Sequence, residues 1–143
     1  MPQDFVFAPE LQAFASGFPA VLLQAAIRVG LLIAGAAIYC LLTPYKDVQE
    51  IRDGNSAAAI SLGGALISLG IPLAASLGAS TSAAEVLIWG AAVTLIQLLI
   101  SRITDIFLTG LPQRIREGEI PAAILLVSAK LAVAIILASA VAG

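Results

Sequence analysis

Residues 120–142 read IPAAILLVSAKLAVAIILASAVA, a run in which Lys130 is the one charged side chain. As a helix with a rise of 1.5 Å per residue, this run measures about 35 Å, enough to cross a hydrocarbon core of about 30 Å. Pro121 falls in the first turn, where the missing N–H of a proline removes no helical hydrogen bond. The stretch therefore predicts a transmembrane helix.

Three similar apolar runs precede it, at Phe18–Leu42, Ser56–Gly78 and Ala83–Leu108. The connections between the runs are short, so consecutive helices must reverse direction. We therefore predict an all-α integral membrane protein in which residues 1–143 form a single membrane domain. Its four transmembrane helices should form one antiparallel bundle. Residues 1–17 alternate aromatic and polar side chains, which predicts a short N-terminal segment lying at the membrane interface.

The composition excludes many functions. Hydrophobic residues make up 60% of the chain and charged residues 11%, too few to cover the surface of a soluble domain. The net charge of −2 disfavours nucleic-acid binding. The sequence has no His, and its single cysteine, Cys40, cannot build a thiolate metal site. We expect no metal and no cofactor, and a lipid bilayer as the surroundings.

The orientation follows from the positive side chains in the short loops. Lys46 and Arg52 follow the first run, and Arg114 and Arg116 follow the third. The N-terminal segment, the connection at residues 79–82 and the C-terminus carry no Lys or Arg. We expect both charged loops in the cytoplasm and both termini on the other side of the membrane.

An internal repeat relates the two charged loops. Residues 51–60 read IRDGNSAAAI, and residues 115–124, 64 positions later, read IREGEIPAAI. Both copies lie in a predicted cytoplasmic loop and lead into an apolar run. We predict two parallel two-helix repeats, at residues 18–78 and 83–143, related by an axis along the membrane normal.

The same residues carry a resemblance to a known family. The strings YCLLTP (39–44), GNSAAAISLGG (54–64), GIPLA (70–74) and Trp89-Gly90 resemble the YjfL-like family of small bacterial inner-membrane proteins, domain of unknown function 350 (DUF350). The resemblance implies tandem two-helix units that carry a Gly-Asn-x-Ala-Ala-Ala-Ile motif, and it implies no activity. The second unit departs from the motif, with Gly118-Glu119 in place of Gly-Asn. Relatives resembling this chain are often encoded near phage-shock-type membrane-binding proteins, which points to a cytoplasmic membrane-associated partner.

Two cations lie deep inside the apolar runs. Arg28 lies about ten residues into the first run, with Gln24 one turn away on the same face, and Lys130 lies ten residues into the fourth. Each could extend its side chain to the nearer interface; alternatively, Arg28 could line a wet cavity or bind an anionic head group. We expect no carboxylate at the depth of either cation.

The third run carries a polar stripe. Its members follow helical spacing: Thr94, Gln97, Ser101, Thr104 and Asp105. Arg102 can reach Asp105 at a spacing of three. The stripe predicts either hydrogen bonds between helices or the lining of a pore.

The second run and the loop before it supply two further candidate groups. Small residues at helical spacing predict a helix-packing face at Ala57, Ser61, Gly64 and Ser68. The preceding residues, Arg52, Asp53, Gly54 and Asn55, are candidates either for capping the next helix or for contacting a partner. Ser82 and Glu85 have the spacing of a capping box for the third run.

These observations favour a non-enzymatic, homo-oligomeric membrane scaffold that engages a cytoplasmic partner through its two repeated loops. A small oligomeric anion channel or transporter, lined by the third run and Arg28, is the alternative. An intramembrane enzyme is disfavoured, because the sequence has no His, no paired carboxylates at one depth and no nucleophile with an evident base.

Overall fold

The computed structural model describes residues 8–42, 47–76 and 82–142. It contains four long helices, α1 (Ala8–Leu42), α3 (Ser56–Ala75), α4 (Ala83–Phe107) and α6 (Ile120–Ala142). Two short helices, α2 (Asp47–Arg52) and α5 (Leu111–Arg116), precede α3 and α6. These described segments contain no strand, and all four long helices have the length and hydropathy to cross a membrane. The prediction of an all-α protein with four membrane-spanning helices is confirmed.

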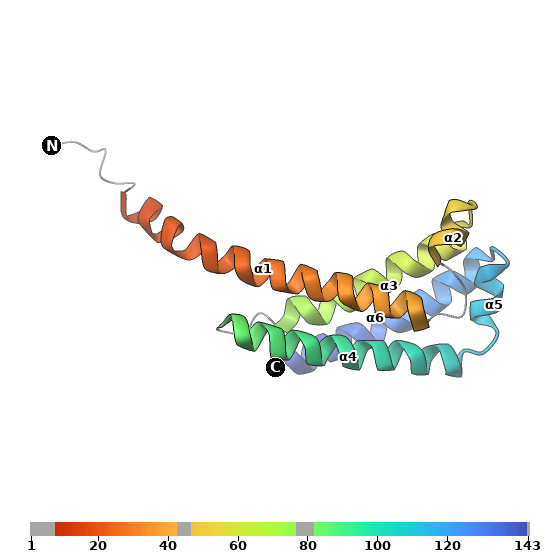
Figure 1. The fold of residues 1–143 in the computed structure, drawn as a ribbon. Coiled ribbons are helices and arrows are strands. Elements are labelled where there is room, and N and C mark those ends of the chain that lie inside the picture. The colour runs from red at the N-terminus through yellow and green to blue at the C-terminus, as the bar shows by residue number, and fades with distance from the viewer. Residues whose placement is uncertain (1–7, 43–46, 77–81, 143) are drawn as a thin grey trace.

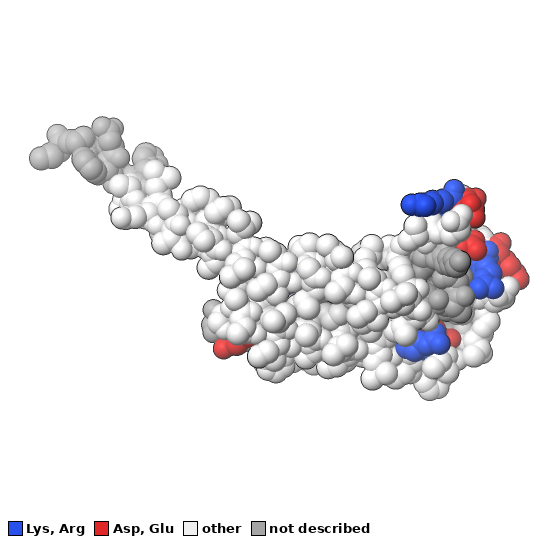
Figure 2. Space-filling view, viewed as in Figure 1, with Lys and Arg blue, Asp and Glu red and all other residues white. Residues whose placement is uncertain are grey.

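The long helices pack side by side, and the short helices lie together at one end (Figure 1). α1 and α4 run in one direction, and α3 and α6 run in the other. The most extensive contact joins α3 to α6, and α4 touches α1, α3 and α6. Acidic and basic side chains gather at the end that carries α2 and α5, whereas the face of the helices in this view is almost free of charge (Figure 2).

The N-terminal helix differs most from its predicted boundaries. α1 begins at Ala8 and continues without a break through Pro19, whereas we expected a transmembrane start at Phe18 after a separate short helix. A proline inside a helix removes one backbone hydrogen bond, and the flanking turns here keep the helix continuous. Its first turns extend beyond the other helices (Figure 1). Residues 1–7 lie outside the described residues, and the interfacial location of the segment stays a prediction.

The other boundaries lie close to the predicted ones. α6 spans the predicted residues, and α4 ends at Phe107, one residue early. α3 ends at Ala75 with Ser76 as its C-cap, and residues 77–78 of the predicted span lie outside the described residues. Asn55 and Ser82 cap α3 and α4 by accepting hydrogen bonds from the N–H groups of Ala58 and Glu85, as their sequence positions predict.

Small residues allow α3 and α6 to approach closely. The predicted packing residues of α3 are all buried at this interface or beside it: Ala57, Ser61, Gly64 and Ser68. A Cβ atom added to Gly64 would lie 2.9 Å from Val127 Cβ and closer still to its methyl groups. Gly35 of α1 approaches Thr94 of α4 in a similar way.

The two loop regions follow the same 64-residue spacing as the sequence. α2 and α5 begin and end 64 residues apart, and so do the starts of α3 and α6. Gly54 and Gly118 both have positive φ angles, 89° and 86°, which favour glycine. Their backbone hydrogen bonds also correspond, because Gly54 N–H donates to Ile51 and Gly118 N–H donates to Ile115.

Candidate functional site

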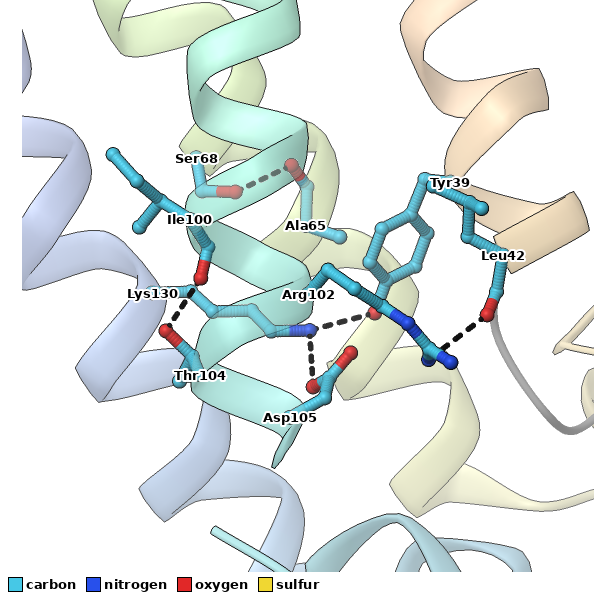
Figure 3. A network of polar contacts seen from close by, with 9 residues as sticks. All are labelled: Tyr39, Leu42, Ala65, Ser68, Ile100, Arg102, Thr104, Asp105 and Lys130. Atoms are coloured by element: carbon cyan, nitrogen blue, oxygen red, sulfur yellow. Dashed lines mark hydrogen bonds and ion pairs between the residues drawn. The ribbon is translucent and has the colours of Figure 1, made fainter. Parts of the chain in front are cut away.

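Lys130 is buried where three long helices meet (Figure 3). Its side chain extends from α6 and is 1% exposed. The Nζ atom donates a hydrogen bond to Tyr39 Oη of α1 at 3.0 Å and pairs with Asp105 Oδ1 of α4, also at 3.0 Å. Nζ also lies 4.8 Å from the centre of the Tyr39 ring. One ammonium group thus connects α1, α4 and α6.

The expectation that Lys130 has no carboxylate at its depth is wrong. Asp105 lies two residues before the end of α4, whereas Lys130 lies ten residues inside α6. The two side chains meet because α6 begins beyond the end of α4, in the part of the molecule that carries α5 (Figure 1). Lys130 is therefore buried beside an acid and does not extend to the surface.

The polar stripe of α4 turns into the bundle. Thr94, Gln97 and Ser101 are buried, and Thr104 and Asp105 are half-buried. The hydroxyls of Thr94 and Thr104 donate to carbonyls one turn earlier in the same helix. Gln97 is fully buried, and neither atom of its amide has a hydrogen-bond partner among the described residues. The polar stripe therefore faces the interior of the helix bundle and not the outer surface of α4.

Arg102 does not form the predicted pair with Asp105. Its Nη1 atom donates to the carbonyl oxygen of Leu42, the last residue of α1, at 3.1 Å. Cations near a helix C-terminus satisfy the last carbonyls and interact favourably with the helix dipole. Arg102 therefore fastens the end of α1 to α4 and leaves Asp105 to Lys130.

Asp105 also borders open space at the charged end of the molecule. A groove of about 380 Å³ is lined by Arg102, Asp105 and residues of the connection between α4 and α5. A cavity of about 10 Å³, the size of one water molecule, adjoins Tyr39, Ser101 and Asp105. The carboxylate thus separates a buried ammonium group from a groove that opens beside the loops.

Asn55 joins the two charged loops. While its side-chain oxygen caps α3, its Nδ2 atom donates to the carbonyl oxygens of Ile115 at 2.9 Å and Arg116 at 3.3 Å. The other three candidates of this loop, Arg52, Asp53 and Gly54, are exposed. At the matching position of the second loop, Glu119 instead pairs with Arg114 in its own loop. Of the two matched residues, Asn55 therefore connects the two loops and Glu119 pairs within its own loop.

We expect Asn55→Ala to lower the free energy of unfolding by about 2 kcal/mol, the upper end of the range for losing an N-cap. The loss of stability should reach this upper end because the substitution also removes the Nδ2 group that donates to two carbonyls of the other loop. Thermal unfolding in mild detergent measures it. Ser82→Ala is the matched control, since Ser82 caps α4 by a single bond, and should cost about 1 kcal/mol. Equal losses for the two variants would show that the cross-connection contributes nothing.

Gln24 and Arg28 lie apart from the Lys130 cluster. Both are half-buried on α1, and Arg28 lies beside Gly70, Leu73 and Ala74, in the last turns of α3. The structure therefore divides the predicted intramembrane polar residues into two groups. Tyr39 is a cluster member that sequence reasoning did not single out. The available signal was a hydroxyl-bearing aromatic one turn before the end of an apolar run.

Comparison with known proteins gives the family. The family model described as Domain of Unknown Function (DUF350) matches residues 13–141, which include Tyr39, Asp105 and Lys130. The chain belongs to the DUF350 family. Two DUF350-like relatives are the proteins named UPF0719 inner membrane protein YjfL from Escherichia coli strain K12 and from Escherichia coli O157:H7. Each is 28% identical over 106 residues, covering 74% of this chain and 80% of the relative. No solved structure matches this DUF350 chain.

Proposed function

We propose that this DUF350 protein is a non-enzymatic scaffold or assembly subunit of the bacterial inner membrane. Its apolar helix faces associate with further copies of the chain, and its charged end engages a cytoplasmic membrane-associated protein. The name of the Escherichia coli relatives supports the inner-membrane location. The positive side chains of the loops support a cytoplasmic position for α2 and α5, with both termini outside.

The cross-connection made by Asn55 carries the scaffold proposal. It joins the α2 and α5 loops, which lie 60 residues apart in sequence, into one surface. Exposed charged side chains of both signs lie on that surface, including Arg52, Asp53 and Glu117. A surface whose parts are held together loses less conformational entropy on binding, which favours recognition of another protein.

A two-unit architecture accounts for this surface. In our proposal, residues 18–78 and 83–143 are parallel two-helix repeats in one antiparallel bundle. The matched bounds of α2 and α5 and the matched glycine conformations support it. The axis between the units would run along the membrane normal, which places both loops on one side of the membrane.

The channel alternative has less support. It requires the polar stripe of α4 to face a central axis shared by several copies. Thr94, Gln97 and Ser101 are buried within one chain, and the outer face of α4 presents side chains such as Leu95, Ile96 and Leu99. An oligomeric pore lined by α4 would therefore have an apolar wall.

Site-specific photocross-linking in cells tests the scaffold. A photoreactive amino acid at position 52 or 117 should cross-link the same cytoplasmic protein, because the two positions lie on one joined surface. Position 87, an exposed leucine near the start of α4, is the control and should yield only lipid or self-adducts. Arg52→Glu should weaken the adduct formed at position 117. If positions 52 and 117 give no adduct with a second protein, the partner role is wrong.

A further inference from the structure

Arg28 is a cation without a partner in the described part of the chain. Its Nε and Nη2 atoms are buried by surrounding atoms and have no hydrogen-bond partner there. An unsatisfied buried donor on a charged group is costly, more so in apolar surroundings. Pro72 has no N–H to donate to the carbonyl of Ser68 in α3, yet neither Arg28 atom bonds to that oxygen. These donors therefore lack an acceptor among the described residues, and an anion bound from the surroundings would supply one.

Two open grooves meet at Arg28. One, of about 270 Å³, runs between α1 and α3 and is otherwise lined by small and apolar residues such as Val29, Leu32 and Leu73. The second, of similar volume, lies on α1 and includes Gln24. No carboxylate of the described segments lines either groove. The shared surface presents a guanidinium and an amide between apolar walls, which suits a molecule with an anionic head and a hydrocarbon tail.

Arg28 lies near enough to the interface opposite the charged loops for its guanidinium to extend to the head-group region. It lies 14 residues from the end of α1 at Leu42, or about 21 Å along the helix axis. The facing residues of α3, Gly70 to Ala74, precede the end of that helix at Ala75. Helical side chains lean toward the N-terminus, and α1 runs toward the charged end, so the guanidinium leans toward the opposite interface.

We propose that Arg28 and Gln24 form a binding site for the phosphate of an anionic phospholipid, with an acyl chain in the groove between α1 and α3. The guanidinium donates charge-assisted hydrogen bonds to phosphate oxygens, and the Gln24 amide adds a further donor. The apolar groove walls favour a lipid over free phosphate, because they bury hydrocarbon that free phosphate lacks. This site is separate from the loop surface and does not depend on the scaffold proposal.

Lipid binding by the delipidated protein in a neutral detergent tests the site. Titration with phosphatidylglycerol, followed by native mass spectrometry and by the thermal midpoint, should show saturable binding and a rise in the midpoint. Diacylglycerol, which lacks the phosphate, and inorganic phosphate, which lacks the chains, should each bind at least tenfold more weakly. Equal protection by inorganic phosphate would overturn the lipid assignment, and no difference between phosphatidylglycerol and diacylglycerol would overturn the site.

Variants connect the binding to the residues. Arg28→Gln should weaken phosphatidylglycerol binding roughly 10- to 100-fold, the range expected for hydrogen bonds to a charged group. The affinity of Arg28→Lys for phosphatidylglycerol should lie between those of wild type and Arg28→Gln, because lysine keeps the charge and loses the planar donor pair. Arg116→Gln is the control, since Arg116 is an exposed cation of α5 at the opposite end of the molecule, and should bind like wild type. Gln24→Leu should weaken binding several-fold, which keeps the test open if Arg28→Gln does not fold. Wild-type affinity in both Gln24→Leu and a folded Arg28 variant would overturn the proposal.

Discussion

Lys130→Met is expected to lower the free energy of unfolding by about 3–5 kcal/mol, the range for removing one partner of a buried ion pair. Methionine matches the length of the lysine stem, so the loss comes from the charge and not from a cavity. The change leaves Asp105 inside the bundle without its cation and removes the hydrogen bond that Lys130 Nζ donates to Tyr39 Oη. Thermal and denaturant unfolding in mild detergent measure the effect.

A double variant tests whether Lys130 and Asp105 stabilise the fold through their direct contact. Lys130→Met combined with Asp105→Leu should recover most of the loss, because replacing both members of a buried pair by apolar residues is often neutral or stabilising. A large coupling energy in the double-mutant cycle is the expected signature of direct contact. Ser128→Ala, at an exposed position on the same helix, is the control. If Lys130→Met costs no more than this control, Lys130 does not hold α1, α4 and α6 together.

The spans could be predicted from the sequence because hydropathy is a local property. An apolar run of sufficient length forms a helix in a bilayer whatever its neighbours do, so α6 lies at its predicted residues. The caps at Asn55 and Ser82 were predictable for the same reason, since each bond joins residues three apart. α1 was predicted less well because Gly17-Phe18-Pro19 resembles a helix start and the structure continues through it.

The cluster around Lys130 could not be predicted, because it depends on how far each helix slides past the next. Residue counts within each run place Asp105 near an interface and Lys130 deep in the membrane, yet the side chains touch. The offset arises because α6 begins beyond the end of α4 (Figure 1), an arrangement that depends on contacts between distant residues. The contacts from Asn55 to Ile115 and from Arg102 to Leu42 join residues about 60 apart and were hidden for the same reason.

Substitutions at two adjacent glycines of α3, Gly63 and Gly64, are expected to change the free energy of unfolding in different directions. Gly64→Ala is expected to lower the free energy of unfolding by about 1–3 kcal/mol, and Gly64→Leu by more, because each added atom overpacks the interface. The first added carbon already collides with the β-branched Val127 of α6, whose side chain has few alternative rotamers. Gly63 has no atom within 4 Å of an added Cβ. Gly63→Ala should therefore leave stability unchanged or raise it by up to about 1 kcal/mol, through the better helix propensity of alanine.

The comparison of these neighbours tests the central contact of the fold. Both substitutions add the same methyl group to the interior of the same helix, so helix propensity affects them alike. What differs is the facing surface, which for Gly64 is α6. Val127→Ala should relieve the loss in Gly64→Ala, because it removes the methyl groups that the new carbon meets. Equal midpoints for Gly63→Ala and Gly64→Ala would mean that α3 is rotated relative to α6. The small-residue face Ala57, Ser61, Gly64 and Ser68 would then not be the surface on which the two helices pack.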